Sequence, residues 1–152
     1  MKVLIPGALR SYTAKGEVDF APPRLEVTAR LNHVKAIQAA DYAYLKSQVT
    51  HGTPKVCIPS PTMVHFRGGR DAISREAYPD IEGFFEDLAA CYRKELAALG
   101  AAGCSYVQLD DTNLAYLCDP QQREAARKRG EDPEALPHTY ARLINASIKD
   151  KP

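Results

Sequence analysis

The chain has 152 residues, with 20 Lys and Arg against 19 Asp and Glu, so its formal charge is +1. This near balance provides no broad field for nucleic acid or anionic lipid and argues against both classes of partner. No apolar run approaches the roughly 20 residues of a transmembrane helix, and the N-terminal residues lack the apolar core of a secretory signal. We therefore expect one soluble, cytoplasmic domain, since about 150 residues suffice for a single core.

The first 21 residues carry turn signals at Pro6-Gly7 and Lys15-Gly16 but no clear element, so we treat them as an irregular lead-in. From residue 24 onward, RLEVTARL alternates apolar and polar side chains, which predicts a strand. Asn32 then caps a helix that we expect to begin near His33. The approximate apolar stripe of that helix consists of Val34, Ile37, Tyr44 and Leu45.

A short apolar strand follows from Val56 to Ile58, and two prolines stop it because proline cannot donate a ladder hydrogen bond. The next clear element is a long amphipathic helix, with Asp80 as its N-cap and with Gly100 and Gly103 at its end. The apolar face of that helix consists of Ile81, Phe84, Phe85, Leu88, Tyr92, Leu96 and Leu99.

A strand from Tyr106 to Leu109 comes next. A short helix then follows, with Asp119 as its cap, a proline at its first position and Gly130 at its end. A last helix around residues 137–148 should bury Tyr140, Leu143, Ile144 and Ile148. This alternation predicts an α/β fold whose parallel sheet is covered by helices, because parallel strands need crossover connections. Ligands of such sheets bind beyond the carboxyl ends of the strands, where PSPTMVHFRGGR and DDTN both fall.

Asp110 and Asp111 leave the predicted strand in succession, so alternation sends their side chains in different directions. A carboxylate there could hold a substrate ammonium group through a charge-assisted hydrogen bond. The alternative is that one of the two caps the following turn, as aspartate often does.

The loop after the preceding strand is rich in donors and glycines, which suits an acidic or polar ligand. Its candidate binding residues are Ser60, Thr62, His65 and Arg67. A purely structural role is the competing interpretation, above all for a histidine without a visible carboxylate partner. No GxSxG, HExxH, P-loop or GxGxxG motif is present.

The four cysteines form no CxxC pair, so no local zinc knuckle or redox dithiol is encoded. We expect Cys57, Cys91 and Cys104 to be reduced and buried, since each lies within an apolar pattern. For Cys118, which follows the acidic pair closely in the sequence, we make no prediction of burial.

Three segments in this order and spacing resemble the cobalamin-independent methionine synthase family: KVCIPSPTMVHFRGGR, YPDIEGFFEDLAACYRKELAALGAAGCSYVQLDDTNLAYLCDP and YARLINASI. The chain is most similar to the shorter single-barrel relatives, over roughly residues 22 to 152. The resemblance implies part of a TIM (β/α)8 barrel that transfers a methyl group from 5-methyltetrahydrofolate, usually polyglutamylated, to the thiol of homocysteine. It also implies that Asp110 contacts the amino group of homocysteine.

The family activates the homocysteine thiol with a zinc ion, bound by a His-x-Cys pair, a glutamate and a distal cysteine. The first pair should follow the INASI helix, whereas this chain ends at Pro152. We therefore expect no metal ligand and no catalytic residue in this chain, and neither Cys118 nor His138 is assigned as a ligand. With three or four of eight βα units, the chain should be an inactive segment of a longer protein, with open edges suited to self-association.

Two alternatives remain open at this stage. A related zinc-thiolate alkyl transferase could use another thiol acceptor such as coenzyme M, which similarity of fold does not exclude. A non-catalytic partial barrel could instead bind a ligand or a partner chain.

Overall fold

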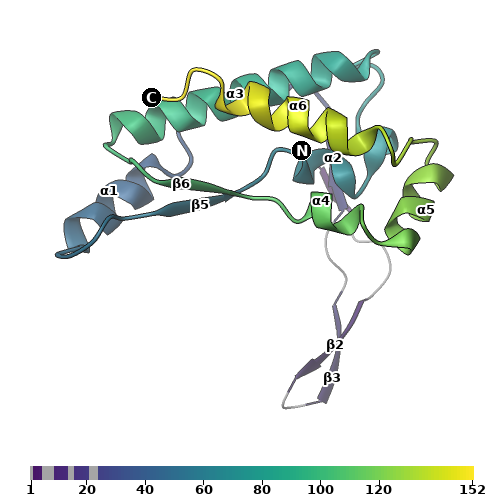
Figure 1. Cartoon of the computed structure of the whole chain (residues 1–152), viewed down its shortest axis with the longest axis horizontal. Coiled ribbons are helices and arrows are strands. Elements are labelled where there is room, and N and C mark those ends of the chain that lie inside the picture. Colours follow the sequence, from purple (N-terminus) through teal and green to yellow (C-terminus); the bar gives the residue numbers. More distant parts are fainter. Residues whose placement is uncertain (1, 5–8, 14–15, 21–23) are drawn as a thin grey trace.

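The computed structural model describes residues 2–4, 9–13, 16–20 and 24–152, with side chains from residue 25 onward. Two antiparallel pairs of strands lie in the N-terminal part (Figure 1). β1 (Lys2–Leu4) pairs with β4 (Arg24–Glu26), and β2 (Leu9–Thr13) forms a hairpin with β3 (Gly16–Phe20). The sequence predicted no regular element before residue 24, and its turn signal at residues 6–7 lies outside the described residues.

The parallel sheet consists of β5 (Val56–Pro59) and β6 (Val107–Asp110), in register from Val56 opposite Val107 to Pro59 opposite Asp110. Directly after β4, Val27 forms an isolated parallel bridge with Ile73. The predicted α/β class with parallel strands is confirmed. Among the described residues this parallel sheet has two strands, and they do not close a barrel.

The long helix α3 (Ile81–Ala101) covers one face of this sheet (Figure 1). Val56 and Ile58 are buried on that face and pack against Leu96 and Leu99. Alternation turns Cys57 to the opposite face, where it is exposed together with Gln108 and Asp110. The expected covering of the sheet by helices holds for one face in the described part of the chain, whereas the expectation that Cys57 is buried is wrong.

The ends of α3 follow the local signals of the sequence. The Asp80 side chain accepts a hydrogen bond from the Glu82 amide at 3.3 Å. Gly103 adopts a φ of 86° just beyond the helix, a conformation that glycine reaches at little cost. The amide of Cys104 then returns to the Leu99 carbonyl at 2.9 Å, and this closes the last turn.

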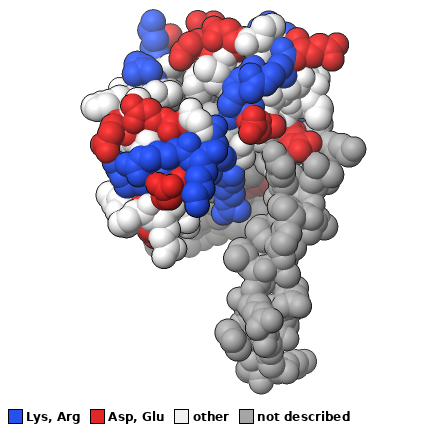
Figure 2. Space-filling view, turned by 90° about the vertical axis from the view of Figure 1, so that its right-hand side faces the viewer, with Lys and Arg blue, Asp and Glu red and all other residues white. Residues whose placement is uncertain are grey.

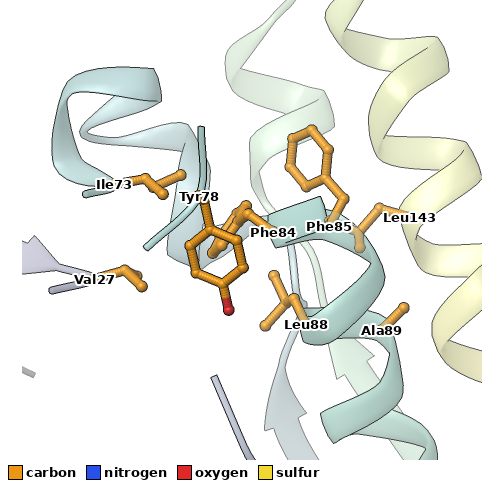
Figure 3. Packing of buried hydrophobic residues seen from close by; sticks show 8 residues of the cluster. All are labelled: Val27, Ile73, Tyr78, Phe84, Phe85, Leu88, Ala89 and Leu143. Atoms are coloured by element: carbon orange, nitrogen blue, oxygen red, sulfur yellow. The ribbon is translucent and has the colours of Figure 1, made fainter. Parts of the chain in front are cut away.

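The last helix, α6 (Leu136–Ile148), packs along α3, and Arg93 ties the two helices by donating to the Ala146 carbonyl at 2.8 Å. Figure 3 shows the core cluster at one end of this contact, with Phe84 and Phe85 of α3 at its centre. The cluster comprises Val27, Ile73, Tyr78, Phe84, Phe85, Leu88, Ala89 and Leu143. Tyr140 and Leu143 are buried as predicted, whereas Ile144 and Ile148 are only half-buried.

Two short helices, α2 (Met63–Phe66) and α4 (Asn113–Tyr116), follow the carboxyl ends of the parallel strands, and the 3-10 helix η1 (Gly69–Ala72) comes after α2. The capped helix α5 (Pro120–Lys128) follows, and Asp119 accepts from the Gln121 amide at 2.7 Å. Buried Ala126 packs α5 against a second cluster that contains Phe66, Leu117, Leu136 and Tyr140.

The helix predicted from His33 begins later, as α1 (Ala39–Gln48), and its predicted apolar stripe is wrong. Val34, Ile37, Tyr44 and Leu45 are all exposed. Tyr42 instead anchors α1, since it is buried and its hydroxyl donates to the Gly103 carbonyl at 2.9 Å.

The surface shown in Figure 2 carries basic and acidic side chains intermingled rather than a field of one sign. Oppositely charged side chains are paired along α5 and the turn after it, as in Arg127 with Glu124 and Arg129 with Glu131. Within the described residues, no helix combines the length and apolar character needed to span a membrane.

Candidate functional site

The candidate site lies where β5 and β6 end side by side. The Ser60 amide donates to the Asp110 carbonyl at 2.9 Å, which extends the pairing by one bond beyond Pro59. The loop after β5 and the start of α4 therefore meet at one edge of the sheet. Of the six predicted site residues, the structure brings together Ser60, Thr62, Asp110 and Asp111.

Asp111 is the centre of this group, and both of its carboxylate oxygens are engaged. Oδ2 accepts from Ser60 Oγ at 2.6 Å and from Thr62 Oγ1 at 2.7 Å. Oδ1 accepts from the amides of Asn113 at 2.9 Å and Leu114 at 3.2 Å, and it thereby caps α4. Burial pushes the pKa of Asp111 upward, but these four hydrogen bonds outweigh it and lower the pKa, so the group is firmly ionised.

Asn113 completes the group and was not among the predicted binding residues. It is fully buried, and its Nδ2 donates to Thr62 Oγ1 at 2.6 Å and to Met63 Sδ at 3.2 Å. The hydroxyl hydrogens of Ser60 and Thr62 both point to Asp111, so Thr62 Oγ1 must accept from the amide and the orientation of the amide is fixed. Its Oδ1 is buried and has no hydrogen-bond partner among the described residues.

Asp110 behaves differently, because its side chain projects from the exposed face of the sheet. Its Oδ1 accepts from Gln108 Nε2 at 2.5 Å, and Gln108 Oε1 in turn accepts from Lys55 Nζ at 3.0 Å. Its Oδ2 forms no hydrogen bond within the described part of the chain. The two aspartates thus point in different directions, as alternation along a strand requires, and Asp110 retains an oxygen for a ligand.

His65 lies in the core rather than at this edge. It is 4% exposed, and its Nδ1 lies 2.9 Å from Tyr140 Oη while its Nε2 lies 3.4 Å from Glu131 Oε1. Burial lowers the pKa of His65 to about 4, with a contribution from the positive charges of Arg129 and Arg70. The ring is therefore neutral at physiological pH, and its carboxylate partner, distant in sequence, could not be recognised from the sequence.

Arg67 is exposed, and its side chain has no hydrogen bond or ion pair with any described residue. Its neighbour Arg70 differs, since its guanidinium donates to the carbonyls of Tyr78 at 2.5 Å and Ile73 at 3.3 Å. Arg70 therefore holds the loop, whereas the guanidinium of Arg67 has no partner among the described residues.

A cavity of about 180 Å³ lies between β5 and α3. Glu95 forms its polar wall: Oε2 lies 2.6 Å from His33 Nε2, and the carboxylate accepts from the amides of Ile37 and Gln38. Burial raises the pKa of Glu95, yet these hydrogen bonds prevail and lower it. On the same wall, burial raises the pKa of Tyr92 to about 12, and its hydroxyl donates to the Pro59 carbonyl at 2.6 Å.

Potential metal ligands do not gather in the described residues. No group of three or more His, Cys, Asp and Glu side chains there could hold a metal ion. All four cysteines are free: Cys57 and Cys118 are exposed, while Cys91 and Cys104 are half-buried rather than buried as predicted. That the zinc ligands of the resembled family lie outside this chain stays a prediction.

Comparison with known proteins gives two sequence relatives, while no protein-family model matches the chain. The uncharacterized Bacillus subtilis protein YxjH is 38% identical over 128 residues, which cover 84% of this chain and 33% of YxjH. The uncharacterized protein YxjG of the same organism is 32% identical over 145 residues, or 94% of this chain and 34% of YxjG. The chain thus spans about a third of the length of these relatives.

One solved structure matches the fold. It is the crystal structure of a Listeria monocytogenes protein provisionally assigned as a vitamin-B12-independent methionine synthase. The TM-score is 0.70 at 37% sequence identity, over 84% of this chain and 37% of the Listeria chain. The family resemblance that the sequence motifs indicated is therefore supported by a similar fold over 84% of this chain.

Proposed function

We propose that this chain provides the amine-binding edge of a methyltransferase that moves a methyl group from 5-methyltetrahydrofolate to the thiol of homocysteine, making methionine. The observation that carries the proposal is the Asp110 carboxylate, which has one oxygen held by Gln108 and the other open at the end of β6. Similarity to the Listeria structure supports the reaction class. A complete (β/α)8 barrel would be needed to enclose the substrates.

The chemistry of Asp110 suits an ammonium group. A carboxylate offers only acceptors, and a charge-assisted hydrogen bond to it is roughly twice as strong as a neutral one. Since Asp111 is saturated by four donors, a single carboxylate remains to pair with a single positive charge. An α-amino acid such as homocysteine carries one such charge beside its carboxylate.

Arg67 is the complementary candidate, because its guanidinium, unpaired within the described structure, could bind an acidic group of homocysteine or of the folate. Bidentate pairing with a carboxylate is the typical use of a free arginine at a binding edge. Together, Asp110 and Arg67 would recognise groups of opposite charge on the substrates.

Zinc in the resembled family lowers the pKa of the substrate thiol and so supplies a thiolate. The described residues do not fit such a centre, since they hold no cluster of three ligands. We therefore assign to this chain a binding role without a metal-dependent step, and we expect the 152-residue chain to be inactive by itself.

A titration followed by ¹H-¹⁵N NMR tests the proposal directly. L-Homocysteine should bind with millimolar affinity, and Asp110→Asn should weaken it by about threefold to tenfold, the range for one exposed charged contact. Asp41→Asn, a charge change on exposed α1, should leave binding unchanged. 4-Mercaptobutanoate, which lacks the amine, should bind Asp110→Asn and the parent chain alike. Equal affinity of the parent and Asp110→Asn chains for homocysteine would exclude the assigned role.

A second candidate function is supported by the open sheet. β5 and β6 pair only with each other among the described residues, and Cys57 and Gln108 lie exposed on the uncovered face. Open edges and faces of this kind favour association with a partner chain. A folded homo-oligomer in sedimentation velocity would support a partner-binding role, whereas a folded monomer would count against it.

A further inference from the structure

The Ser60–Asp111–Thr62 hydrogen bonds, which we call the carboxylate clamp, immediately adjoin Asp110. The Asp110 carbonyl accepts from the Ser60 amide at 2.9 Å. The next side chain along the strand, Asp111, is held by the hydroxyls of Ser60 and Thr62. The backbone of Asp110 is therefore fixed on both sides by one loop, and this fixes the direction in which its side chain leaves the sheet.

We propose that Ser60, Thr62 and Asp111 are positioning residues, which aim the Asp110 carboxylate and do not themselves contact the substrate. The inference rests on the proposed role of Asp110 as the amine anchor. It deepens that role by dividing the predicted binding residues into one contact and a clamp behind it.

The hydrogen-bond inventory of the clamp supports this division. A hydroxyl has one hydrogen to donate, and those of Ser60 and Thr62 are both directed at Asp111 Oδ2. Thr62 Oγ1 also accepts from Asn113 Nδ2. Ser60 and Thr62 are fully buried, so neither has a free donor or an exposed surface for a ligand.

The side-chain amide of Asn113 supports the clamp while one of its own polar atoms stays without a hydrogen bond to any described residue. Its Nδ2 is directed to Thr62, and its own Oδ1 stays buried without a partner in the described structure. Buried polar atoms without partners are rare in folded proteins, and violations of this kind concentrate where function constrains the structure. Thr62 is thus held by Asn113 as well as by Asp111.

Positioning matters for Asp110 because it is exposed and its side chain is guided mainly by its backbone and by Gln108. A displacement of about 1 Å at a binding group is enough to lose much of its contribution. Loss of the clamp should therefore separate Asp110 from Gln108 and weaken amine binding, even though no substrate contact has been removed.

The side-chain amide of Gln108 provides a reporter that needs no ligand, since its Nε2 donates to Asp110. In the double variant Ser60→Ala, Thr62→Val, we expect its NMR signals to move to the positions of a free glutamine side chain. Homocysteine binding should weaken by about threefold and by no more than in Asp110→Asn, because a misplaced carboxylate loses at most the contact that it makes. Thr62→Ser, which keeps the hydroxyl, should retain both the reporter signals and the affinity.

Ser147→Ala is the matched control, because Ser147 is fully buried and its Oγ donates to the Leu143 carbonyl at 2.8 Å in α6. It should lower the urea midpoint without moving the Gln108 signals or the affinity. Should the double variant not fold, Thr62→Val alone decides, with a smaller shift of both readouts.

A folded clamp variant with unchanged Gln108 signals and unchanged affinity would overturn the inference. If the parent chain does not bind homocysteine but the Gln108 signals move in the clamp variants, the proposed function fails and the positioning role stands. If homocysteine binds the parent and the clamp variants equally, the positioning role fails and the proposed function stands.

Discussion

Glu95 joins the segment before α1 to the middle of α3, and Glu95→Gln is the most informative single perturbation of the fold. Glu95 is 5% exposed, and its carboxylate accepts from the amides of Ile37 and Gln38 and from His33 Nε2. Glutamine has nearly the same shape but replaces one acceptor oxygen by an NH2 group. That group cannot accept from an amide, and it can lie opposite His33 Nε2 only if the imidazole takes the tautomer that accepts there, so the charge-assisted hydrogen bonds of Glu95 are lost or weakened.

The magnitude follows from the bonds removed. A hydrogen bond to a charged group contributes about 1.5–3 kcal/mol, whereas a neutral one contributes about 0.5–1.5 kcal/mol. We expect Glu95→Gln to lower the free energy of unfolding by about 3 kcal/mol, measured by urea denaturation followed by circular dichroism. Glu86→Gln, the same change at an exposed position of α3, should stay within about 0.5 kcal/mol of the parent.

Hydrogen exchange and pH then separate this explanation from a general loss of stability. The amides of Ile37 and Gln38 should exchange faster in Glu95→Gln by more than the global loss of stability explains. Because the folded-state pKa of Glu95 is lowered, its stabilisation is present above the ordinary value of 4.5 and is lost as the pH falls through the folded-state pKa. The stability difference between the parent and Glu95→Gln should therefore shrink in acid. Unchanged exchange at both amides, with a constant difference across pH, would refute the reasoning.

Two further predictions concern the core around α3. Phe84 is 0% exposed and packs against the rings of His65, Tyr78 and Phe85, so Phe84→Ala should lower the free energy of unfolding by about 3–5 kcal/mol in urea, and a loss under about 1 kcal/mol would contradict the packing. His65 has a folded-state pKa of about 4 against an ordinary 6.5, so below pH 6.5 the unfolded chain takes up a proton that the folded chain rejects. Stability should fall by about 3 kcal/mol between these two pH values, and His65→Gln should remove that part of the slope. A slope that is identical in the variant would show that another group titrates.

Local signals predicted those elements whose ends and faces are set within one stretch of chain. In α3, the Asp80 cap, the apolar spacing and the glycines beyond the helix all concern residues within a few turns of one another. The same holds for α5, whose cap and terminating glycine lie directly at its ends. The separation of Asp110 from Asp111 was also predictable, because alternation along a strand is a property of the backbone.

The start of α1 could not be predicted in this way. Asn32 is a suitable cap by residue type, yet the amides of Ile37 and Gln38 are bound by Glu95, more than fifty residues away. A long-range acceptor thus competes with helix formation at its first turn. The apolar residues at 34, 37, 44 and 45 suggested a buried stripe, while Tyr42 makes the buried contact.

The sequence by itself determined the α/β class, the long covering helix, the edge of the sheet where polar residues collect, and the family resemblance. Only the tertiary structure decided which polar residue does what: Asp111 is saturated by Ser60 and Thr62, His65 is buried against Tyr140, and Cys57 faces outward. The physical reason is that caps and periodicity act over a few residues. The burial and hydrogen bonding of a side chain depend instead on segments that meet only when the chain folds.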